Sequence, residues 1–337
     1  MVTIREVAQR AGVSTATVSR VVNGSSHVTP ETRDKILQII QDLNYVPDGL
    51  ARGTAMQQSR IIGMIVPDIR NGSFAEIYLG ASDVASRHGY VMWLVDSNDN
   101  PKHEREMWLQ LRRVRVDGVL VTPVDSRVNS EVWKTSPVPL CFVDRNVDSP
   151  LCDFVGIDNF HGVYEATKFL LNNRHTHLGI IAGPQSNSAG RDRLAGFMAA
   201  MHEAACNVHR DDVAIGDFHE KSGYLLGRRM LAKDPPPSGI VVCNNLMTSG
   251  LLQAIADTAS VRLGETVAVI GFDDFPLATA MDPALSVVSR PMREVGAKAA
   301  ELLILRLSQP NRAISQVILG PHMILRGSER FPSKRHV

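Results

Sequence analysis

The 337-residue sequence has few cysteines, and none of them is spaced like the ligands of a metal centre. The four are Cys141, Cys152, Cys206 and Cys243, scattered along the chain without a CxxC pair. In a reducing compartment, cysteines spaced in this way are small packing residues. We therefore expect neither a zinc site nor any other metal or cofactor.

Long apolar runs and a strong charge of one sign are also missing. No run reaches the length of a membrane span, and the N-terminus is polar rather than secretory, so we expect a cytoplasmic protein. The formal net charge is only +1, which gives no sign of a polyanionic partner. Any evidence for nucleic-acid binding has to come from the residue pattern instead.

Signature motifs of common enzyme classes are absent. The sequence has no GxSxG elbow and no GxGxxG or GxxxxGK[ST] phosphate loop. His175 and His177 resemble a metal-binding pair, but no third ligand is placed nearby, and a polar turn before the strand LGIIAG explains them better. We therefore predict no catalytic residue and no enzymatic activity.

Three short helices are predicted in the first 46 residues. The first runs from about Ile4 to Ala11, where Thr3 and Glu6 form a capping box. Gly12 ends this helix, and Ser14 or Thr15 caps a second one that reaches Asn23-Gly24. A third is capped at Thr29 with Pro30 at its first position, and its predicted core residues are Ile36, Leu37, Ile40 and Leu43.

Two short helices joined by a glycine-containing turn predict a helix-turn-helix, whose second helix enters the DNA major groove. The outward face of that helix presents Thr15, Ala16, Ser19 and Arg20. Arg20 is the best base reader, because its guanidinium can bond guanine O6 and N7 together. The alternative is a plain helical hairpin with a solvated polar face, which a helix face of almost only Ser, Thr and Arg makes less favourable.

From Ile61 onward the pattern changes to apolar runs that alternate with helical stretches. One set contains IIGMIVP, VMWLVDS and DGVLVTP, and a second contains LGIIAGP, GIVVCNN and TVAVIGFDD. This alternation predicts βαβ units and two doubly wound parallel sheets, an α/β core. A crossover is expected near Phe160–Gly162, and ALSVVSRP with the helix after it should return the chain to the first lobe.

Polar residues follow three of the predicted strands, namely Asp144, Asn244 and Asp273. Ligands of open parallel sheets bind at the carboxyl ends of strands, so we expect these side chains to line one cleft. Arg191, in the SNSAGRDRLAGF segment, is a fork-shaped donor able to hold two ligand oxygens. Each strand-end residue alone could instead be a helix cap or turn former.

Nearly the whole chain resembles the LacI/GalR family of bacterial transcription regulators. The resemblance is carried by TIREVAQRAGVSTATVSRVVNG, ETRDKILQIIQDLNYVPDGLAR and VIGFDD, in family order. It implies a helix-turn-helix headpiece (residues 1–46), a hinge (47–60) and a two-lobed periplasmic-binding-protein-like core (61–337). The N-lobe should comprise about 61–160 and 291–319, and the C-lobe about 162–289 and 321–330.

The resemblance also implies residue roles. Base-reading positions fall on Thr15, Ala16 and Arg20, and DNA-backbone contacts on Thr3, Ser14, Thr17 and Asn23. Effector contacts fall on Asp144, Arg191, Asn244 and Asp273, with the Phe218 ring against the ligand and with Ser73 and Phe74 on the N-lobe cleft loop. One departure is Asn244-Asn245, where the family usually has Asn-Asp, so the effector cannot be copied from a relative.

The hinge differs from the family more clearly. In relatives a hinge leucine is wedged into the central base step, whereas Thr54 occupies that position here, and Leu50 and Arg52 are the other expected hinge contacts. Either the DNA is bent less, or Leu50, one helical turn earlier, supplies the wedge.

The resulting prediction is a homodimeric regulator, most simply a repressor, that binds a pseudo-palindromic operator and is controlled by a sugar-like effector in the cleft. The dimer interface is expected along N-lobe helices near residues 74–88 and 104–113, with C-lobe helices. A sugar-binding protein without DNA binding and a sugar-modifying enzyme are the alternatives.

Overall fold

The computed structural model describes residues 2–22, 27–45 and 58–330 and divides into two compact units, Met1–Arg60 and Ile61–Val337. The described part of the first unit is all helical. Its helices are α1 (Ile4–Ala11), α2 (Thr15–Val22) and α3 (Pro30–Asp42). None of the described helices in either unit is long and apolar enough to cross a membrane.

The predicted caps of these helices are present. Thr3 accepts a hydrogen bond from the Glu6 amide while the Glu6 carboxylate accepts from the Thr3 amide, so the capping box is confirmed. Gly12 ends α1 in the left-handed region, at φ 72°, which suits a residue without a Cβ. Of the two caps considered for α2, the Ser14 hydroxyl accepts from the Thr17 amide at 3.1 Å.

The small core of the first unit differs from the prediction at one position. Val7, Val18 and Ile36 are fully buried, but Leu37 is 44% exposed and Ile39 is buried instead. Positions 36, 39, 40 and 43 follow the three-to-four spacing of one helix face, and position 37 lies about 100° around the helix from position 36. The prediction of Leu37 as a core residue was therefore wrong.

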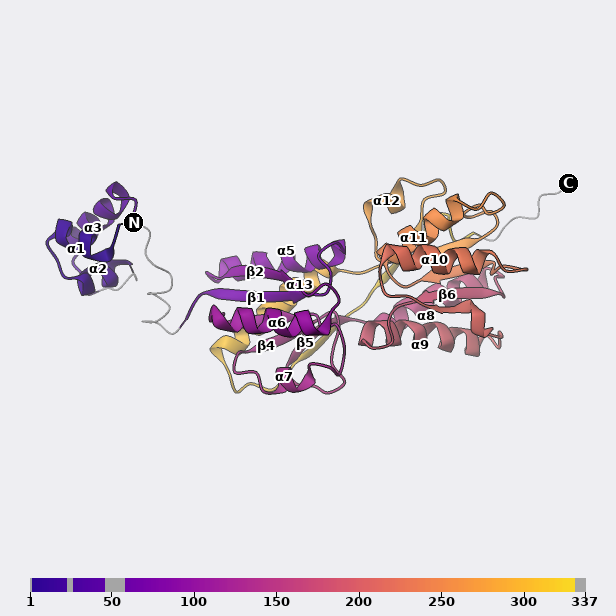
Figure 1. Cartoon of the computed structure of the whole chain (residues 1–337), viewed down its shortest axis with the longest axis horizontal. Helices are drawn as coiled ribbons and strands as arrows, with labels where there is room; N and C mark the ends of the chain where they lie inside the picture. Colours follow the sequence, from indigo (N-terminus) through magenta and orange to yellow (C-terminus); the bar gives the residue numbers. More distant parts are fainter. Residues whose placement is uncertain (1, 23–26, 46–57, 331–337) are drawn as a thin grey trace. The chain divides into compact units, whose positions relative to one another are not determined.

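The second unit contains two six-stranded sheets, as the alternating pattern predicted (Figure 1). In the first sheet the spatial order is β11 (Gln316–Leu319), β5 (Asp153–Ile157), β4 (Leu140–Val143), β3 (Gly118–Val121), β1 (Ile61–Val66) and β2 (Val91–Asp96). In the second sheet it is β12 (His322–Ile324), β10 (Ser286–Ser289), β9 (Ala268–Phe272), β8 (Gly239–Val242), β6 (Leu178–Ala182) and β7 (Val213–Ile215). Among the described strands, all pairings are parallel except that of β10 with β12.

Helices cover both faces of the first sheet. We call this sheet and its helices the N-lobe. The helices α5 (Gly72–Arg87) and α13 (Met292–Ser308) pack together on one face, over alternate β1 residues such as Met64. The helices α6 (Pro101–Arg113) and α7 (Ser130–Lys134) bury Trp108 and Trp133 with Ile65 on the other. Burial on both faces explains why the strands are continuous apolar runs.

The second sheet and its helices form the C-lobe. Figure 1 shows α8 (Asn159–Asn172) and α9 (Ser188–Glu203) on one face and α10 (Glu220–Leu231) and α11 (Asn245–Ala256) on the other. The short helix α12 (Pro276–Thr279) follows β9. One apolar cluster that includes Phe197, Met247 and Phe272 joins these layers.

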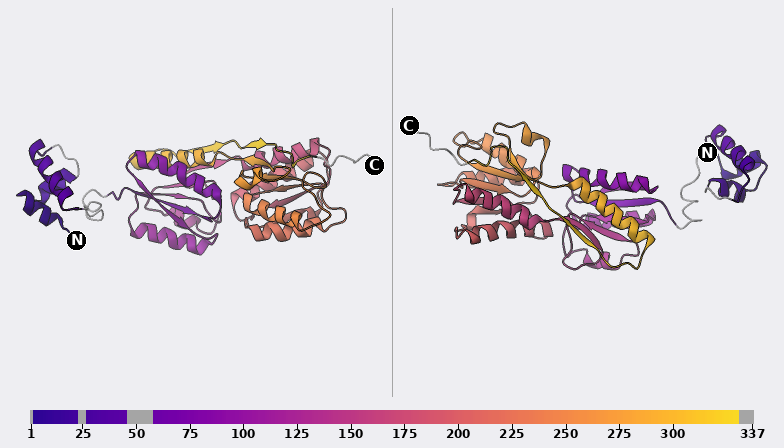
Figure 2. Two further views of the ribbon diagram at one scale, coloured as in Figure 1. Left: turned by 90° about the horizontal axis from the view of Figure 1, so that it is seen from above. Right: turned by 180° about the vertical axis from the view of Figure 1, so that it is seen from behind.

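Within residues 58–330 the chain crosses between the lobes after β5, after β10 and after β11. The late segments, coloured yellow in Figure 2, run from one lobe to the other. The predicted crossover near Phe160 and the return through α13 are thereby confirmed. These crossings bring the carboxyl ends of strands from both sheets to one interlobe region.

Candidate functional sites

The first candidate site is the outward face of α2. Val18 and Val21 are buried, whereas Thr15, Ala16 and Arg20 are exposed. Since the two sets lie on opposite sides of one short helix, the residues predicted to read bases point away from the core. A small neutral stretch with one terminal guanidinium is a shape that fits a major groove.

Residues predicted to touch the DNA backbone flank this face. Thr3 and Ser14 are exposed at the starts of α1 and α2, while Thr17 is half-buried. Ser19, which was predicted on the groove-facing side, is also half-buried. The hydroxyls of Ser14 and Thr17 lie 2.9 Å apart, which orients both. Outside the described residues lie four further predicted contacts, Asn23, Leu50, Arg52 and Thr54.

The second candidate site is a cleft between the lobes. Asp144 follows β4 of the N-lobe, and Asn244 and Asp273 follow β8 and β9 of the C-lobe. All three line one cavity, as strand-end positions suggested. The full lining comprises Asn71, Phe74, Asp144, Arg145, Ala189, Arg193, Phe218, Asn244, Asp273 and Arg290. Asp144 and Asp273 both have left-handed backbones, with φ 63° and 78°.

Arg290, which sequence reasoning missed, joins the two aspartates across the lobes. Its Nη1 lies 2.5 Å from Asp144 Oδ1, and its Nε lies 2.5 Å from Asp273 Oδ1. The three side chains are each at most 5% exposed. Burial alone would lower the pKa of Arg290, but the two carboxylates raise it. The only hint in the sequence was a basic residue directly after an apolar strand at a lobe crossing.

Of the two arginines in the predicted loop segment, Arg193 lines the cavity, whereas Arg191, which was predicted as an effector contact, does not belong to the lining. Both belong to α9, where two positions correspond to about 200° of rotation, so they face different ways. Arg193 is 2% exposed, whereas Arg191 lies half-buried and pairs with Asp148 at 2.7 Å. The available signal was helical spacing, because Arg193 falls in register with the buried Ala189, Phe197 and Ala200.

Two aromatic rings form a wall of this cavity. Phe74 and Phe218 are buried, and the Arg145 guanidinium carbon lies 5.9 Å and 5.1 Å from their ring centroids. The space left between these groups is about 10 Å³, enough for about one water. An adjoining cavity of about 560 Å³ is lined by Ser73 and shares Asp273 and Arg290.

The two asparagines at the start of α11 have different partners. The Asn244 side chain caps the helix by accepting from the Met247 amide and donates to the Phe218 carbonyl, so the helix-cap alternative applies to it. Asn245 Nδ2 donates to Asn71 Oδ1 across the lobes at 3.1 Å. An aspartate at position 245 could not donate this bond, since an ionised carboxylate only accepts.

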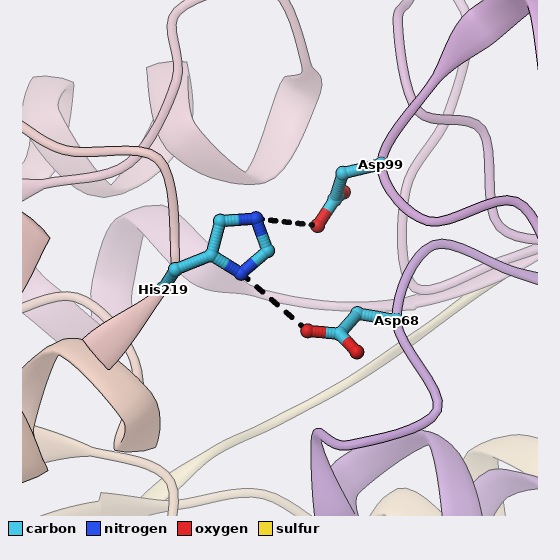
Figure 3. A group of neighbouring side chains, drawn as sticks. All are labelled: Asp68, Asp99 and His219. Carbon is cyan, nitrogen blue, oxygen red and sulfur yellow. Dashed lines mark ion pairs between the residues drawn. The ribbon is translucent and has the colours of Figure 1, made fainter. Parts of the chain in front are cut away.

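At the rim of the cleft, His219 of the C-lobe lies between Asp68 and Asp99 of the N-lobe (Figure 3). The ring nitrogens Nδ1 and Nε2 are 3.5 Å from Asp68 and 3.6 Å from Asp99. The geometry could accommodate a cation. However, Arg70 donates two side-chain hydrogen bonds to Asp68, and Arg145 lies 3.6 Å from Asp99, so both carboxylates already have counter-charges. We therefore interpret the group as an interlobe contact.

Comparisons with known proteins agree with this arrangement. Residues 3–48 match the family model described as bacterial regulatory proteins, lacI family. Residues 59–326 match the model described as periplasmic binding proteins and sugar binding domain of LacI family.

Similar proteins extend over nearly the whole chain. It is 32% identical to the HTH-type transcriptional repressor PurR of Pasteurella multocida, covering 97% of this chain and 98% of that protein. It is 30% identical to the ribose operon repressor of Haemophilus influenzae, at 97% and 98% coverage. The solved lac repressor dimer bound to operator and the anti-inducer ONPF has a TM-score of 0.87 at 26% identity, covering 98% of this chain and 99% of that one. The cellobiose complex of the transcriptional regulator CelR has a TM-score of 0.75 at 28% identity, covering 97% and 100%.

Proposed function

The chain belongs to the LacI family of bacterial regulatory proteins. We propose that it is a repressor whose affinity for operator DNA is controlled by a small molecule bound in the interlobe cleft. The observation that carries the proposal is the pairing of an outward-facing α2 with a two-lobed core in one chain. The PurR protein and the ribose operon repressor described above are repressors, and we propose likewise a non-catalytic protein that acts in the cytoplasm.

We assign DNA reading to the headpiece (residues 1–46), coupling to the hinge (47–60) and effector binding with dimerisation to the core (61–337). On α2, Thr15, Ala16 and Arg20 would contact base edges, because they are the exposed side chains of its groove-facing side. Thr3, Ser14, Thr17 and Asn23 would hold the DNA backbone, and Ser19 would lie on the groove-facing side beside the base readers.

In the hinge, the choice between Thr54 and Leu50 as the wedge can be made by measuring DNA bending. Fluorescence transfer across a labelled operator reports the bend directly. If Leu50 is the wedge, Leu50→Ala abolishes the bend; if it is not, Thr54→Leu increases both the bend and the affinity, because leucine fills the base step better. Bending unchanged by either substitution would exclude insertion as the way this hinge works.

Effector binding is assigned to Ser73, Phe74, Asp144, Arg193, Phe218, Asn244 and Asp273, with Arg193 in place of Arg191. The space of about 10 Å³ between the lobes is too small for a sugar, so the lobes must part to admit one. A ligand that favours one lobe arrangement shifts the population of the other. Because coupling is reciprocal, effector and operator change each other's affinity by the same factor.

Dimerisation is supported by apolar side chains at one edge of the N-lobe. Leu79 of α5 is 42% exposed, and Val91 and Trp93 of the edge strand β2 are 61% and 43% exposed. An unpaired strand edge with exposed apolar groups favours association. A two-fold dimer would place one headpiece on each half-site of a palindromic operator.

The proposal is tested by selecting DNA with the full chain from fragments of its source genome. We expect enrichment of short palindromic sites, bound by dimers in analytical ultracentrifugation. Adding small molecules that raise the melting temperature should change the affinity for the enriched sites, because a ligand of the folded state also shifts its lobe equilibrium. Selection that enriches no sequence, or turnover of a bound sugar, would contradict the proposal.

A further inference from the structure

Three buried arginines converge on the interlobe cavity. Arg145 follows β4, Arg193 belongs to α9 and Arg290 follows β10, so they come from three separate elements. Arg145 and Arg193 are 5% and 2% exposed, and the Arg290 side chain is 3% exposed. Among the described residues, Asp144 and Asp273 are the carboxylates of the same lining, and Asp99, outside the lining, lies 3.6 Å from Arg145.

Both carboxylates are used by one arginine. Arg290 lies 2.5 Å from an oxygen of Asp144 and 2.5 Å from an oxygen of Asp273. The attraction in a buried ion pair offsets the free-energy cost of desolvation only when its geometry is good and its polar atoms are hydrogen-bonded. The triad of Asp144, Arg290 and Asp273 has short contacts at both ends. Among the described residues, Arg290 is therefore the cavity guanidinium in ion-pair contact with these two carboxylates.

Arg193 is held only by neutral groups. Its Nε donates to Asn159 Oδ1 at 2.8 Å, its Nη1 donates to the Cys243 carbonyl, and its guanidinium carbon lies 3.9 Å from the Phe272 ring centroid. Across the described residues, no carboxylate comes within the 4.0 Å of an ion pair with it. Burial, and then the charge of Arg290, lower the pKa of Arg193 to about 10. A buried cation in this state would be stabilised by an added anion.

Arg145 is only weakly paired. Its closest carboxylate is Asp99 at 3.6 Å, which also lies 3.6 Å from His219. Burial raises the pKa of Asp99, so that its charge is itself costly. The Nε of Arg145 is buried without a hydrogen-bond partner.

The two underpaired guanidinium groups flank one ring. The Arg145 carbon lies 5.1 Å and the Arg193 carbon 5.8 Å from the Phe218 centroid. Guanidinium groups are fork-shaped donors suited to planar carboxylates and to phosphate oxygens. Asp144 and Asp273 lie across the same cavity and could accept hydroxyl hydrogen bonds from the rest of a ligand.

We infer that the effector is an anion, a polyhydroxylated compound whose carboxylate or phosphate group binds between Arg145 and Arg193 beside the Phe218 ring. The inference rests on the proposed function, because it names the ligand class of the same cleft. Lobe opening would admit the compound, and the adjoining cavity of about 560 Å³ shares Asp273 and Arg290 with the anion site. A neutral sugar would leave the Arg193 guanidinium with only neutral hydrogen-bond partners.

The test uses matched compounds on the full-length chain. For glucose, galactose, mannose and ribose, the neutral sugar, its sugar acid and its terminal phosphate are compared by thermal shift and calorimetry. We expect at least one charged member to bind at least about tenfold more tightly than its neutral parent. Acids and phosphates form separate arms, which identify the anionic group. Equal or tighter binding of a neutral parent would overturn the inference.

Inorganic phosphate provides a probe that does not depend on the sugar. At equal ionic strength, phosphate should raise the melting temperature of the wild type, relative to chloride, more than that of Arg193→Met. The matched control is Arg191→Met, which removes the same charge two residues away on the same helix and should behave like the wild type. If the three proteins respond equally and no charged compound binds preferentially, no anion site exists here.

Substitution also links the site to the compound found. Arg193→Met should lower the affinity for the charged compound by about 10- to 100-fold. Arg191→Met should leave that affinity unchanged. Different outcomes would refute the proposed regulation and the anion site. A charged compound that binds without changing operator affinity would refute the proposed regulation and keep the anion site. A neutral sugar that releases the operator would refute the anion site and keep the proposed regulation.

Discussion

The face of α2 and the interlobe cleft place their functional side chains in opposite ways. On α2 they come from six consecutive residues, 15–20, and the predicted base readers among them are exposed. In the cleft they come from positions as far apart as Asn71 and Arg290, and most are buried. A surface site can change its specificity at little cost to folding, whereas the cleft residues also hold two lobes together. Function and stability should therefore be separable on α2 and coupled in the cleft.

The largest expected effect that follows from this contrast is on Arg290. Arg290→Met leaves two buried carboxylates without their counter-charge, so the free energy of unfolding of the core should fall by about 3–5 kcal/mol. Urea unfolding followed by tryptophan fluorescence reports on the core alone, because Trp93, Trp108 and Trp133 all lie in the N-lobe.

The matched control for this substitution is Arg293→Met. Arg293 pairs with Asp83 at the surface, where both side chains are 58% exposed, so a change below about 1 kcal/mol is expected. Equal unfolding curves for the two variants would show that the Arg290 ion pairs do not hold the lobes, and that the cleft is no more coupled to stability than the surface is.

The second largest expected effect is the pH dependence of core stability that the buried Glu104 causes. Burial raises the pKa of Glu104 to about 7, from 4.5, although the Asn129 side chain and the Val124 amide donate to it. Between these two pH values the folded state binds more protons than the unfolded state, so the free energy of unfolding decreases as pH rises. The loss is complete above about pH 7 and amounts to at most about 3 kcal/mol.

The measurement is the difference in unfolding free energy between the wild type and Glu104→Gln from pH 4.5 to pH 8. Glutamine does not titrate, so the wild type should lose stability relative to the variant as pH rises. A difference that stays constant over this range would mean that Glu104 titrates normally. α2 has no buried acid. The protection of its amides against hydrogen exchange should therefore not follow the pH dependence of this free-energy difference.

On α2, Arg20→Ala should cost about 1–3 kcal/mol on the selected operator and relax the preference at one base pair per half-site. Because Arg20 is exposed, the unfolding free energy should not change. Fluorescence anisotropy with operators mutated one base pair at a time measures both the loss of affinity and the change in base preference. Lys35→Ala, an exposed α3 residue, removes the same charge as a control. A uniform loss on all DNA would make Arg20 a phosphate contact.

The smallest expected effect is on the cap of α1. Thr3→Ala removes the acceptor of the Glu6 amide and should destabilise the helix by about 1 kcal/mol. Amide hydrogen exchange followed by mass spectrometry should show about fivefold faster exchange in α1 and no change in the core. Faster exchange in the cleft segments would indicate that the two units unfold together, which would weaken the separation drawn above.

Most of the architecture could be predicted because its signals are local. The capping box at Thr3 and Glu6, the stop at Gly12 and the Pro30 start of α3 each depend on residues within one helical turn. The apolar strand runs were equally clear, since strands buried on both faces are continuous in sequence. Leu37 was the local error, because several apolar residues in a row left the buried face of α3 ambiguous.

The positions of Asp144, Asn244 and Asp273 in one cavity were predictable from strand ends, but their partners were not. Arg290 and Asp144 are 146 residues apart, and no local pattern records that they meet. The choice between Arg191 and Arg193 depended on where α9 begins, since its rotation decides which guanidinium faces the cleft. Periodicity sets which residues of one element share a face. Only the packing of one lobe against the other decides which charges lie within bonding distance, because that distance depends on two sheets and three crossings at once.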